Sequence, residues 1–248
     1  MVKGLDIFCQ YFADCVDQYV LIGGAACDIA FENSGTSFRA TRDLDMVLII
    51  EALTSEFGEK LWDFIEAGKY RNKATNAGKP QFYRFDKPEE DSFPKMIELF
   101  CRSDFALKDA AGITPIHIDD EISSLSAILL DDDYYKVLLE GKTVKNGLSV
   151  LKPEYIILFK AKAYLDLKER KENGEKVDTS DIKKHKKDIL RIAAELMLEK
   201  AIDLPVSVTD DIHSFIASLE EEPFDRNLLK MYGLKNEDIV ALLKQIFE

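Results

Sequence analysis

Residues 19–50 read YVLIGGAACDIAFENSGTSFRATRDLDMVLII, and this stretch decides how the first half of the chain is expected to fold. The apolar run at about 18–22 predicts a buried strand. The pair Gly23-Gly24 predicts a tight turn into a short helix. After a polar loop, a second apolar run at about 44–50 predicts another strand. The stretch therefore predicts a strand–helix–strand unit with sharp turns between its elements.

Two aspartates, Asp43 and Asp45, stand where the second strand begins. Side chains alternate along a strand, so both carboxylates point to one face and Leu44 points into the core. Neighbouring carboxylates repel each other unless a divalent cation lies between them, and Mg²⁺ bound to a substrate phosphate suits such an all-oxygen site. The alternative is a capping residue or an exposed strand edge, either of which carries an aspartate without a metal.

The turn at Gly23-Gly24 offers a second element of the same chemistry. Backbone N–H groups at the start of a helix have no intrahelical acceptor, and they bind phosphate readily. Arg39 and Arg42 flank the acids, where a guanidinium either pairs with a triphosphate or balances the local negative charge. A phosphate cradle beside an acid pair indicates nucleotide chemistry.

A site with two metal ions usually needs a third carboxylate. The leading candidate is Glu98, in the strand pattern KMIELF, where Ile97 and Leu99 are expected to face the core and Glu98 the opposite surface. The alternative is an ordinary solvent-facing acid on an antiparallel strand. Asp86 is a weaker candidate, because it lies at a strand end.

The composition is that of an ordinary soluble globular protein, with 248 residues, 46% apolar and 32% charged. The N-terminal residues lack the apolar core of a signal peptide, and no apolar run approaches the roughly 20 residues that span a bilayer. The four cysteines show neither CxxC nor zinc-finger spacing, so we expect reduced thiols. We therefore expect a cytoplasmic protein without membrane contact.

The formal net charge of −13 argues against a general nucleic-acid binder. The segment 168–191 nevertheless holds nine Lys and Arg residues against six Asp and Glu residues. One interpretation is a solvated helix face with its loop. The other is a basic rim that steers a polyanionic substrate toward an otherwise acidic protein. The sequence leaves both open.

The pattern of elements predicts an α+β fold. The first part, 1–151, is expected to form a mixed sheet with flanking helices, and the second part, 152–248, an α-helical bundle. Asn146-Gly147 between apolar residues predicts a type I′ hairpin. The segment between Gly68 and Pro80 has no periodicity and is expected to be a mobile loop.

The run of Gly-Gly, a short helix, Arg-x-Thr-x-Asp-Leu-Asp and an apolar strand resembles the nucleotidyltransferase superfamily with the polymerase-β-like minimal fold. It resembles most the AbiEii/AbiGii toxin family. The matching residues are Gly23, Gly24, Arg39, Thr41, Asp43 and Asp45, with Glu98 in the place of the third acid. Two departures stand out: Ala25 follows the glycines where many members carry a hydroxyl, and Glu98 replaces the usual Asp.

The resemblance extends into the helical half. LKPEYIILFKAKAY is similar to a family segment in which a lysine, here Lys160, follows Pro-Glu by about two turns. DIKKHKKDILRIA is similar to the family's Lys-Asp helix, with Asp188 in the matching position and His185 one turn before it. The rival interpretations are an exposed lysine, an exposed ion-pairing acid and a surface histidine.

The resemblance implies the roles of these residues. Asp43 and Asp45 hold two Mg²⁺ (or Mn²⁺) ions, and Glu98 binds one of them and helps to deprotonate the acceptor hydroxyl. The Gly-Gly turn holds the triphosphate of an NTP substrate, Lys160 neutralises phosphate charge, and Asp188 orients Lys160 or the base.

Three functions follow as hypotheses. The first is transfer of a nucleoside monophosphate (NMP) from an NTP to an RNA end or a protein hydroxyl, by a toxin whose cognate antitoxin is a partner. The second is modification of a small cationic molecule, as in enzymes that modify aminoglycosides. The third is a catalytically silent module that binds a nucleotide or a partner protein. The departures at Ala25 and Glu98 favour this third hypothesis.

Overall fold

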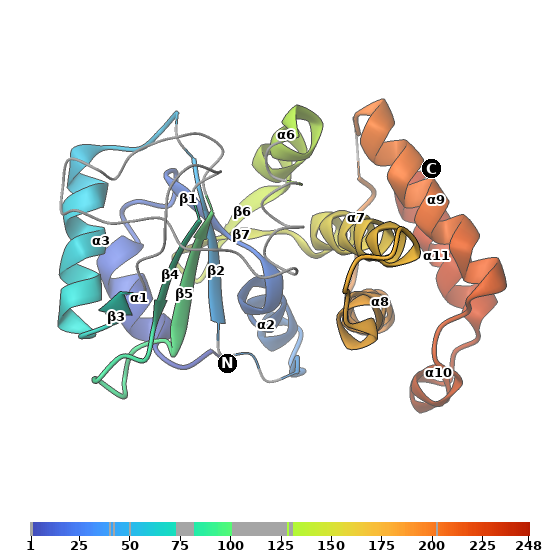
Figure 1. The fold of residues 1–248 in the computed structure, drawn as a ribbon, viewed down its shortest axis with the longest axis horizontal. Helices are drawn as coiled ribbons and strands as arrows, with labels where there is room; N and C mark the ends of the chain where they lie inside the picture. Colours follow the sequence, from blue (N-terminus) through green and yellow to red (C-terminus); the bar gives the residue numbers. More distant parts are fainter. Residues whose placement is uncertain are drawn as a thin grey trace. The chain divides into compact units, whose positions relative to one another are not determined.

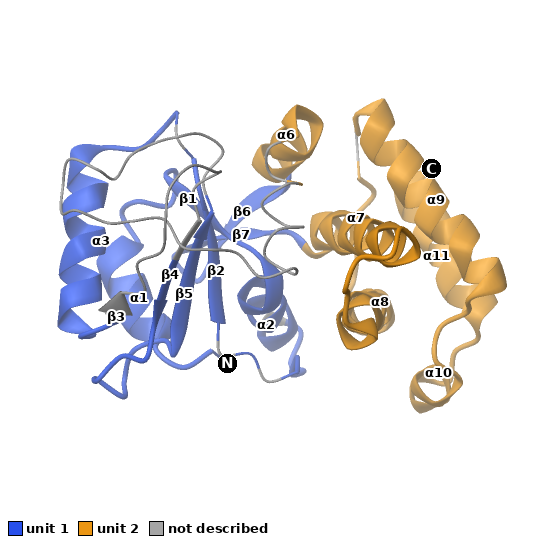
Figure 2. Ribbon diagram, viewed as in Figure 1, with its two compact units in different colours: residues 1–119, 141–152 blue, residues 120–140, 153–248 orange. Residues whose placement is uncertain are grey.

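A computed structural model describes residues 2–39, 41, 43–49, 51–72, 82–100, 128, 131–201 and 203–248. The chain divides into two compact units (Figure 2), of which the first comprises residues 1–119 with 141–152 and the second 120–140 with 153–248. The division predicted from the sequence, 1–151 and 152–248, stays a prediction. The units differ from it in the segment 120–140, which falls in the second unit, and at residue 152, which falls in the first.

Unit 1 contains a mixed sheet with helices on both faces, which confirms the predicted fold class. Its elements are α1 (Leu5–Phe12), β1 (Tyr19–Leu21), α2 (Gly23–Asn33), β2 (Asp43–Leu48), α3 (Ser55–Ala67), β3 (Arg71–Asn72), β4 (Phe82–Asp86), β5 (Met96–Phe100), β6 (Lys142–Lys145) and β7 (Leu148–Leu151). The described strands form one seven-stranded sheet in the order β3-β4-β5-β2-β1-β7-β6. The pairs β2–β5 and β1–β7 are parallel, and the other neighbours are antiparallel.

An aromatic cluster holds α1 and α3 on one face of this sheet. Phe8 and Phe12 recur at helical spacing, and both rings contact Phe64 of α3 and Tyr19 of β1 at centroid distances of 5.5–6.2 Å. Helix α2 covers the opposite face, beside β2 (Figure 1). Its buried side chains include small ones such as Ala25 and Ala26, which allow close approach to the strand.

The hairpin β6–β7 turns at Asn146 and Gly147, whose φ angles are 52° and 77°. Positive φ at both central positions is what a type I′ turn requires, so the predicted hairpin is confirmed. Most of the predicted loop between Gly68 and Pro80 lies outside the described residues, although Arg71–Asn72 forms the short edge strand β3.

Unit 2 is helical, as the sequence predicts. Its elements are α6 (Asp132–Gly141), α7 (Pro153–Glu172), α8 (Thr179–Glu195), α9 (Val206–Glu221), α10 (Arg226–Tyr232) and α11 (Asn236–Phe247). Helix α7 begins with a proline at its first position and is buried on most sides, because α8 and α9 pack against it. Helix α11 packs against α9 and α8. Within the described part of the chain, no helix combines the length and apolarity needed to cross a membrane.

Candidate functional site

Three charged side chains form a row across neighbouring strands of unit 1. Asp45 of β2 faces Glu98 of β5 in the parallel register, and Glu98 faces Arg84 of β4 in the antiparallel register. Residues at facing register positions point to the same side of a sheet, so these three side chains share one face. Glu98 therefore lies directly beside Asp45, as the sequence predicts, whereas Asp86 lies in line with Asp43 but one strand further away, beyond Met96.

The row lies on the face that α2 covers. Tyr19 points toward the aromatic cluster of α1 and α3, and its register partner on β2 is Leu48. Side chains alternate along β2, so Leu44 is buried on the α1 and α3 face. Asp43 and Asp45 therefore point to the other face, both half-buried. The predicted orientation of the acid pair agrees with this geometry.

The two glycines at the start of α2 lie directly against Asp45 and Thr41. A Cβ atom at Gly23 would lie 2.1 Å from Oδ2 of Asp45, and one at Gly24 would lie 2.5 Å from Oγ1 of Thr41. Gly23 also has a φ of +60°, a conformation that side-chain-bearing residues rarely adopt. The structure thus brings together four residues that the sequence motif singles out: Gly23, Gly24, Thr41 and Asp45.

The N-terminus of α2 is aimed at the same place. The helix begins at Gly23, so the two glycines form its first turn and do not precede it as the sequence predicts, and its N-cap residue Ile22 provides no side-chain cap. The backbone N–H of Ile22 donates to the carbonyl oxygen of Asp45 at 3.0 Å, which fixes the turn to β2. The first N–H groups of the helix and its dipole therefore offer a positive end beside the acids.

Glu98 is buried, with 7% of its surface exposed. The guanidinium of Arg84 donates to its Oε1 through Nε at 2.8 Å and through a terminal nitrogen at 2.7 Å. Burial and the adjacent Asp45 carboxylate, to which the neutral Glu98 carboxyl hydrogen-bonds, raise the pKa of Glu98 to about 8 against the opposing effect of Arg84. The alternative of a solvent-facing acid is therefore wrong: residues 97–100 are buried on both faces of β5.

This cluster offers carboxyl oxygens as donors, and once Glu98 is ionised the two carboxylates of Asp45 and Glu98 exceed the single guanidinium of Arg84 in charge. Such an excess, in a buried place, fits a divalent cation that phosphate oxygens would coordinate further. Within the described part of the chain, however, no three His, Cys, Asp or Glu side chains are gathered closely enough to hold a metal ion by themselves. The predicted cage of Asp43, Asp45 and Glu98 around two ions stays a prediction.

The other predicted phosphate ligands differ in where they lie. Arg39 is half-buried and its guanidinium lies 5.3 Å from the centroid of the Phe38 ring. Thr41 contacts the glycine turn as described above, while Arg42 lies outside the described residues. Ala25, the departure from the family pattern, offers no hydroxyl because its side chain is a methyl group. It is also fully buried, so its position has no access to solvent.

Lys160 and Asp188 form an ion pair inside unit 2. Nζ of Lys160 lies 2.7 Å from Oδ2 of Asp188, and the two residues are 7% and 1% exposed. Neither is the exposed surface residue of the rival interpretation, which is wrong for both. His185, one turn before Asp188, is half-buried. The expectation that Asp188 orients Lys160 fits this contact, whereas a role of the pair in phosphate chemistry stays a prediction.

Arg84 is the residue of this cluster that sequence reasoning missed. The sequence gives only a weak signal for it: a positive charge flanked by aromatic residues in the strand FYRFD must point either to a partner or to solvent. Choosing between these requires the register of β4 with β5, which no local pattern gives.

No protein-family model and no curated protein matches the chain. Among solved structures, an antigenic nucleotidyltransferase-like protein from Paracoccidioides brasiliensis is similar, with a TM-score of 0.48 and 16% sequence identity. The alignment covers 98% of this chain and 94% of that protein. At this level of similarity the comparison carries no argument about function, so the proposal below is based on the geometry of unit 1 and on the sequence motif.

Proposed function

We propose that the chain is a metal-dependent nucleotidyltransferase that moves an NMP from an NTP to a hydroxyl group of RNA or protein. One observation carries the proposal: Gly23, Glu98 and Asp45, far apart in sequence, meet at one point on the α2 face of the sheet. A helix N-terminus that favours phosphate and an acid cluster that favours a cation are complementary halves of an NTP site.

The residues divide the work of the reaction between them. The N–H groups at the start of α2 hold the triphosphate, and Arg39 and Arg42 neutralise part of its charge. Asp43, Asp45 and Glu98 are the side chains that would hold Mg²⁺ or Mn²⁺, and the bound metal supplies charge stabilisation on the departing pyrophosphate. The acceptor oxygen forms a bond to the α-phosphorus while the bond to the pyrophosphate oxygen breaks.

Glu98 has a second use in this proposal. The family resemblance implies that its carboxylate also helps to take the proton of the acceptor hydroxyl as the new bond to phosphorus forms. Lys160 and Asp188 enter through the family resemblance, with Lys160 neutralising phosphate charge and Asp188 orienting it. The resemblance also suggests the biological setting of a toxin with a cognate antitoxin.

One observation favours the silent binding module as a second candidate. Arg84 already takes two hydrogen-bond positions on Glu98 and neutralises its charge, so Glu98 is less available to a metal than a lone carboxylate. In such a module the glycine turn and the acid pair would bind a nucleotide without turnover.

The test is transfer of label from each α-³²P-labelled NTP, with Mg²⁺ and with cell RNA, cell protein and an aminoglycoside offered as separate acceptors. The variant Asp43→Ala/Asp45→Ala removes the acid pair. Its matched control is Asp63→Ala/Glu66→Ala, which removes two exposed acids of α3 with no role in the site.

Label in a discrete RNA or protein band, lost in the first variant and kept in the second, would support the proposal and name the acceptor. Label only on the aminoglycoside would favour the small-molecule alternative. Absence of transfer to every acceptor, with nucleotide binding intact by calorimetry, would favour the silent module and contradict the proposal.

A further inference from the structure

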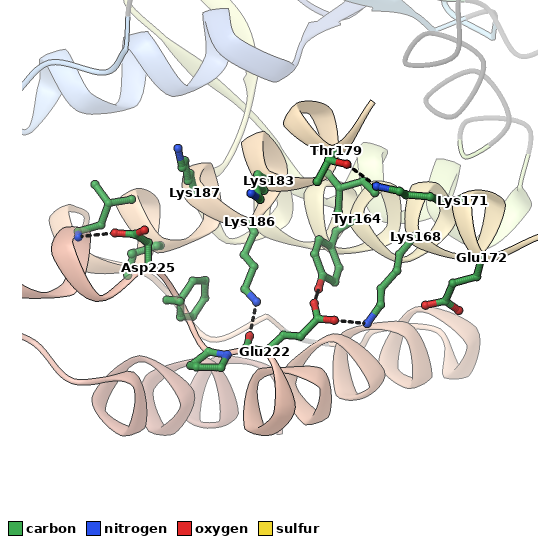
Figure 3. A pocket seen from close by; sticks show the side chains of 15 residues that line it. Tyr164, Lys168, Lys171, Glu172, Thr179, Lys183, Lys186, Lys187, Glu222 and Asp225 are labelled. Atoms are coloured by element: carbon green, nitrogen blue, oxygen red, sulfur yellow. Dashed lines mark hydrogen bonds and ion pairs between the residues drawn. The ribbon is translucent and has the colours of Figure 1, made fainter. Parts of the chain in front are cut away.

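Unit 2 contains a pocket of about 700 Å³ between α7, α8, the segment after α9, and α10 (Figure 3). Every residue that lines it belongs to this unit. A volume of this size suits a ligand as large as a nucleotide. Its lining contains five lysines: Lys168, Lys171, Lys183, Lys186 and Lys187.

The lining also contains three acids, of which two have structural tasks. Glu222 accepts hydrogen bonds from the hydroxyl of Tyr164 at 2.7 Å and from Nζ of Lys168 at 3.0 Å (Figure 3). Asp225 caps α10, because its Oδ1 accepts from the backbone N–H groups of Asn227 and Leu228. The acids therefore neutralise few of the lysines around them.

The remaining lysines have neutral partners or none. Lys171 donates to the hydroxyl of Thr179, and Lys186 donates to the backbone carbonyl of Glu222. In the described part of the chain, the side chains of Lys183 and Lys187 make no hydrogen bond or ion pair, and both are exposed. Figure 3 shows both on α8, with Lys187 extending away from Glu222.

Lys186 is the most constrained of these cations. Its ammonium lies 5.5 Å from the ring centroid of Tyr164 and 5.8 Å from that of Phe224. Burial and the charge of nearby Lys168 lower its pKa, against the charge of Glu222. A half-buried ammonium with so little carboxylate around it would be stabilised by an added anion.

The arrangement differs from a solvated helix face in its shape and its charge balance. Like charges three or four residues apart on one helix, as Lys183 is from Lys186 and Lys187, repel each other. They are concentrated around a concave site, although the chain as a whole carries a net charge of −13. The lining also includes the apolar side chains of Ile182, Leu190 and Phe224, which suit the base or sugar of a nucleotide.

We propose that this pocket binds the phosphate groups of a nucleotide-containing ligand, either the backbone of single-stranded RNA or a free nucleotide. Lysine suits phosphate as a mobile point charge, and exposed lysines such as Lys183 and Lys187 can reach successive phosphates. Binding here is independent of catalysis. Only the further step, that a bound RNA is the acceptor of the transferred NMP, rests on the proposed function.

The test measures binding of a fluorescein-labelled single-stranded RNA by anisotropy, and of ATP by calorimetry. Both are done in EDTA, which removes metal-dependent binding at the acid cluster of unit 1. The pocket variant is Lys183→Glu/Lys187→Glu. Its control, Lys200→Glu/Lys244→Glu, changes the net charge equally at exposed lysines outside the pocket. Thermal unfolding of both variants checks that the fold is kept.

We expect the pocket variant to weaken binding by about tenfold or more and to flatten its salt dependence, since fewer counterions are released. The control variant should keep most of the affinity. RNA binding alone identifies a nucleic-acid strand as the ligand, and ATP binding alone identifies a free nucleotide. Absence of binding by both probes, or equal loss in the two variants, would overturn the proposal. This binding test does not measure NMP transfer, so a negative result in the transfer assay would leave the binding result unaffected.

Discussion

Unit 1 and unit 2 each bury a carboxylate against a cation, but with a different balance of charge. In unit 1, Glu98 meets both Arg84 and a second acid, Asp45, beside the open end of α2. In unit 2, Lys160 and Asp188 form a matched pair that is almost fully buried. The cluster in unit 1 has an unbalanced charge that a ligand can neutralise, whereas Lys160 and Asp188 in unit 2 neutralise each other.

The difference teaches that burial of a charged group does not by itself mark a functional site. A matched pair has a structural explanation, because losing either partner leaves an uncompensated charge in the core. An unmatched cluster costs stability in the absence of its ligand, and a ligand of opposite charge relieves that cost. Variants of the first cluster should therefore lose function, and variants of the second should lose stability.

The largest expected effect is on activity in unit 1. Asp45→Asn keeps the shape of the side chain and removes one of the two repelling carboxylates. We expect transfer to fall by about a thousandfold or more, and the free energy of unfolding without metal to stay equal or rise. Transfer assays measure the activity and urea titration measures the free energy of unfolding. Asp63→Asn on the exposed surface of α3 is the control. Full activity of Asp45→Asn would contradict the assignment.

The largest expected effect on stability is in unit 2. Lys160→Met removes the cation that pairs with the buried Asp188, which should cost about 3–5 kcal/mol of unfolding free energy. Lys160→Met/Asp188→Leu removes both charges and should recover most of that loss. Chemical denaturation of the two variants measures their free energies of unfolding and shows whether charge pairing explains the burial of Lys160 and Asp188. A double variant as unstable as the single one would show that the pair does not explain their burial.

A smaller effect is expected at the glycine turn, where two variants distinguish the steric contact between residue 23 and Asp45 from backbone strain. Gly23→Ala and Gly35→Ala both place alanine at positive φ, at a cost of about 1–2 kcal/mol each. Only Gly23→Ala also drives a Cβ against Oδ2 of Asp45, since an added Cβ at Gly35 has no atom within 4 Å. We expect an additional loss of transfer of about a hundredfold in Gly23→Ala alone. Similar activities of the two variants would contradict the close contact.

The smallest effect is the pH dependence of metal binding. The pKa of Glu98 is raised from 4.5 to about 8 in the folded protein. Between pH 4.5 and 8 the carboxyl is therefore protonated in the folded state and ionised in the unfolded state. Metal-free stability should therefore fall as pH rises from 4.5 to 8, and stay level above. A cation must displace the proton, so Mg²⁺ affinity should rise by up to about tenfold per pH unit in this window.

Calorimetry in buffers of different ionisation enthalpy measures the protons released when Mg²⁺ binds. Glu98→Gln should abolish the release and the pH dependence. If both persist in Glu98→Gln, another group titrates at this site.

Local patterns predict much of the fold and part of the site. The period-2 pattern placed Asp43 and Asp45 on one face, and Asn146-Gly147 predicted the hairpin. These features depend on neighbours in sequence. Helices α6 and α10 were not predicted, although each follows an aspartate, Asp131 or Asp225, whose side chain caps its first turn.

Long-range pairing explains what the sequence could not predict. The burial of Glu98 and its contact with Arg84 depend on the register of β5 with both β2 and β4. The contact of Lys160 with Asp188 depends on how α7 packs against α8. The excess of lysine in the segment 168–191 was visible, but only the packing of α7, α8 and α10 shows that it surrounds a pocket.

The most direct test of the account measures NMP transfer and unfolding free energy together, in Asp45→Asn and in Lys160→Met/Asp188→Leu. The account predicts that Asp45→Asn abolishes transfer and keeps its stability. It predicts that the unit 2 double variant keeps a stability near that of the wild type and loses less transfer than Asp45→Asn, because Lys160 only neutralises phosphate charge whereas Asp45 would hold the metal. Transfer that survives in Asp45→Asn and is lost in the stable unit 2 variant would contradict the account.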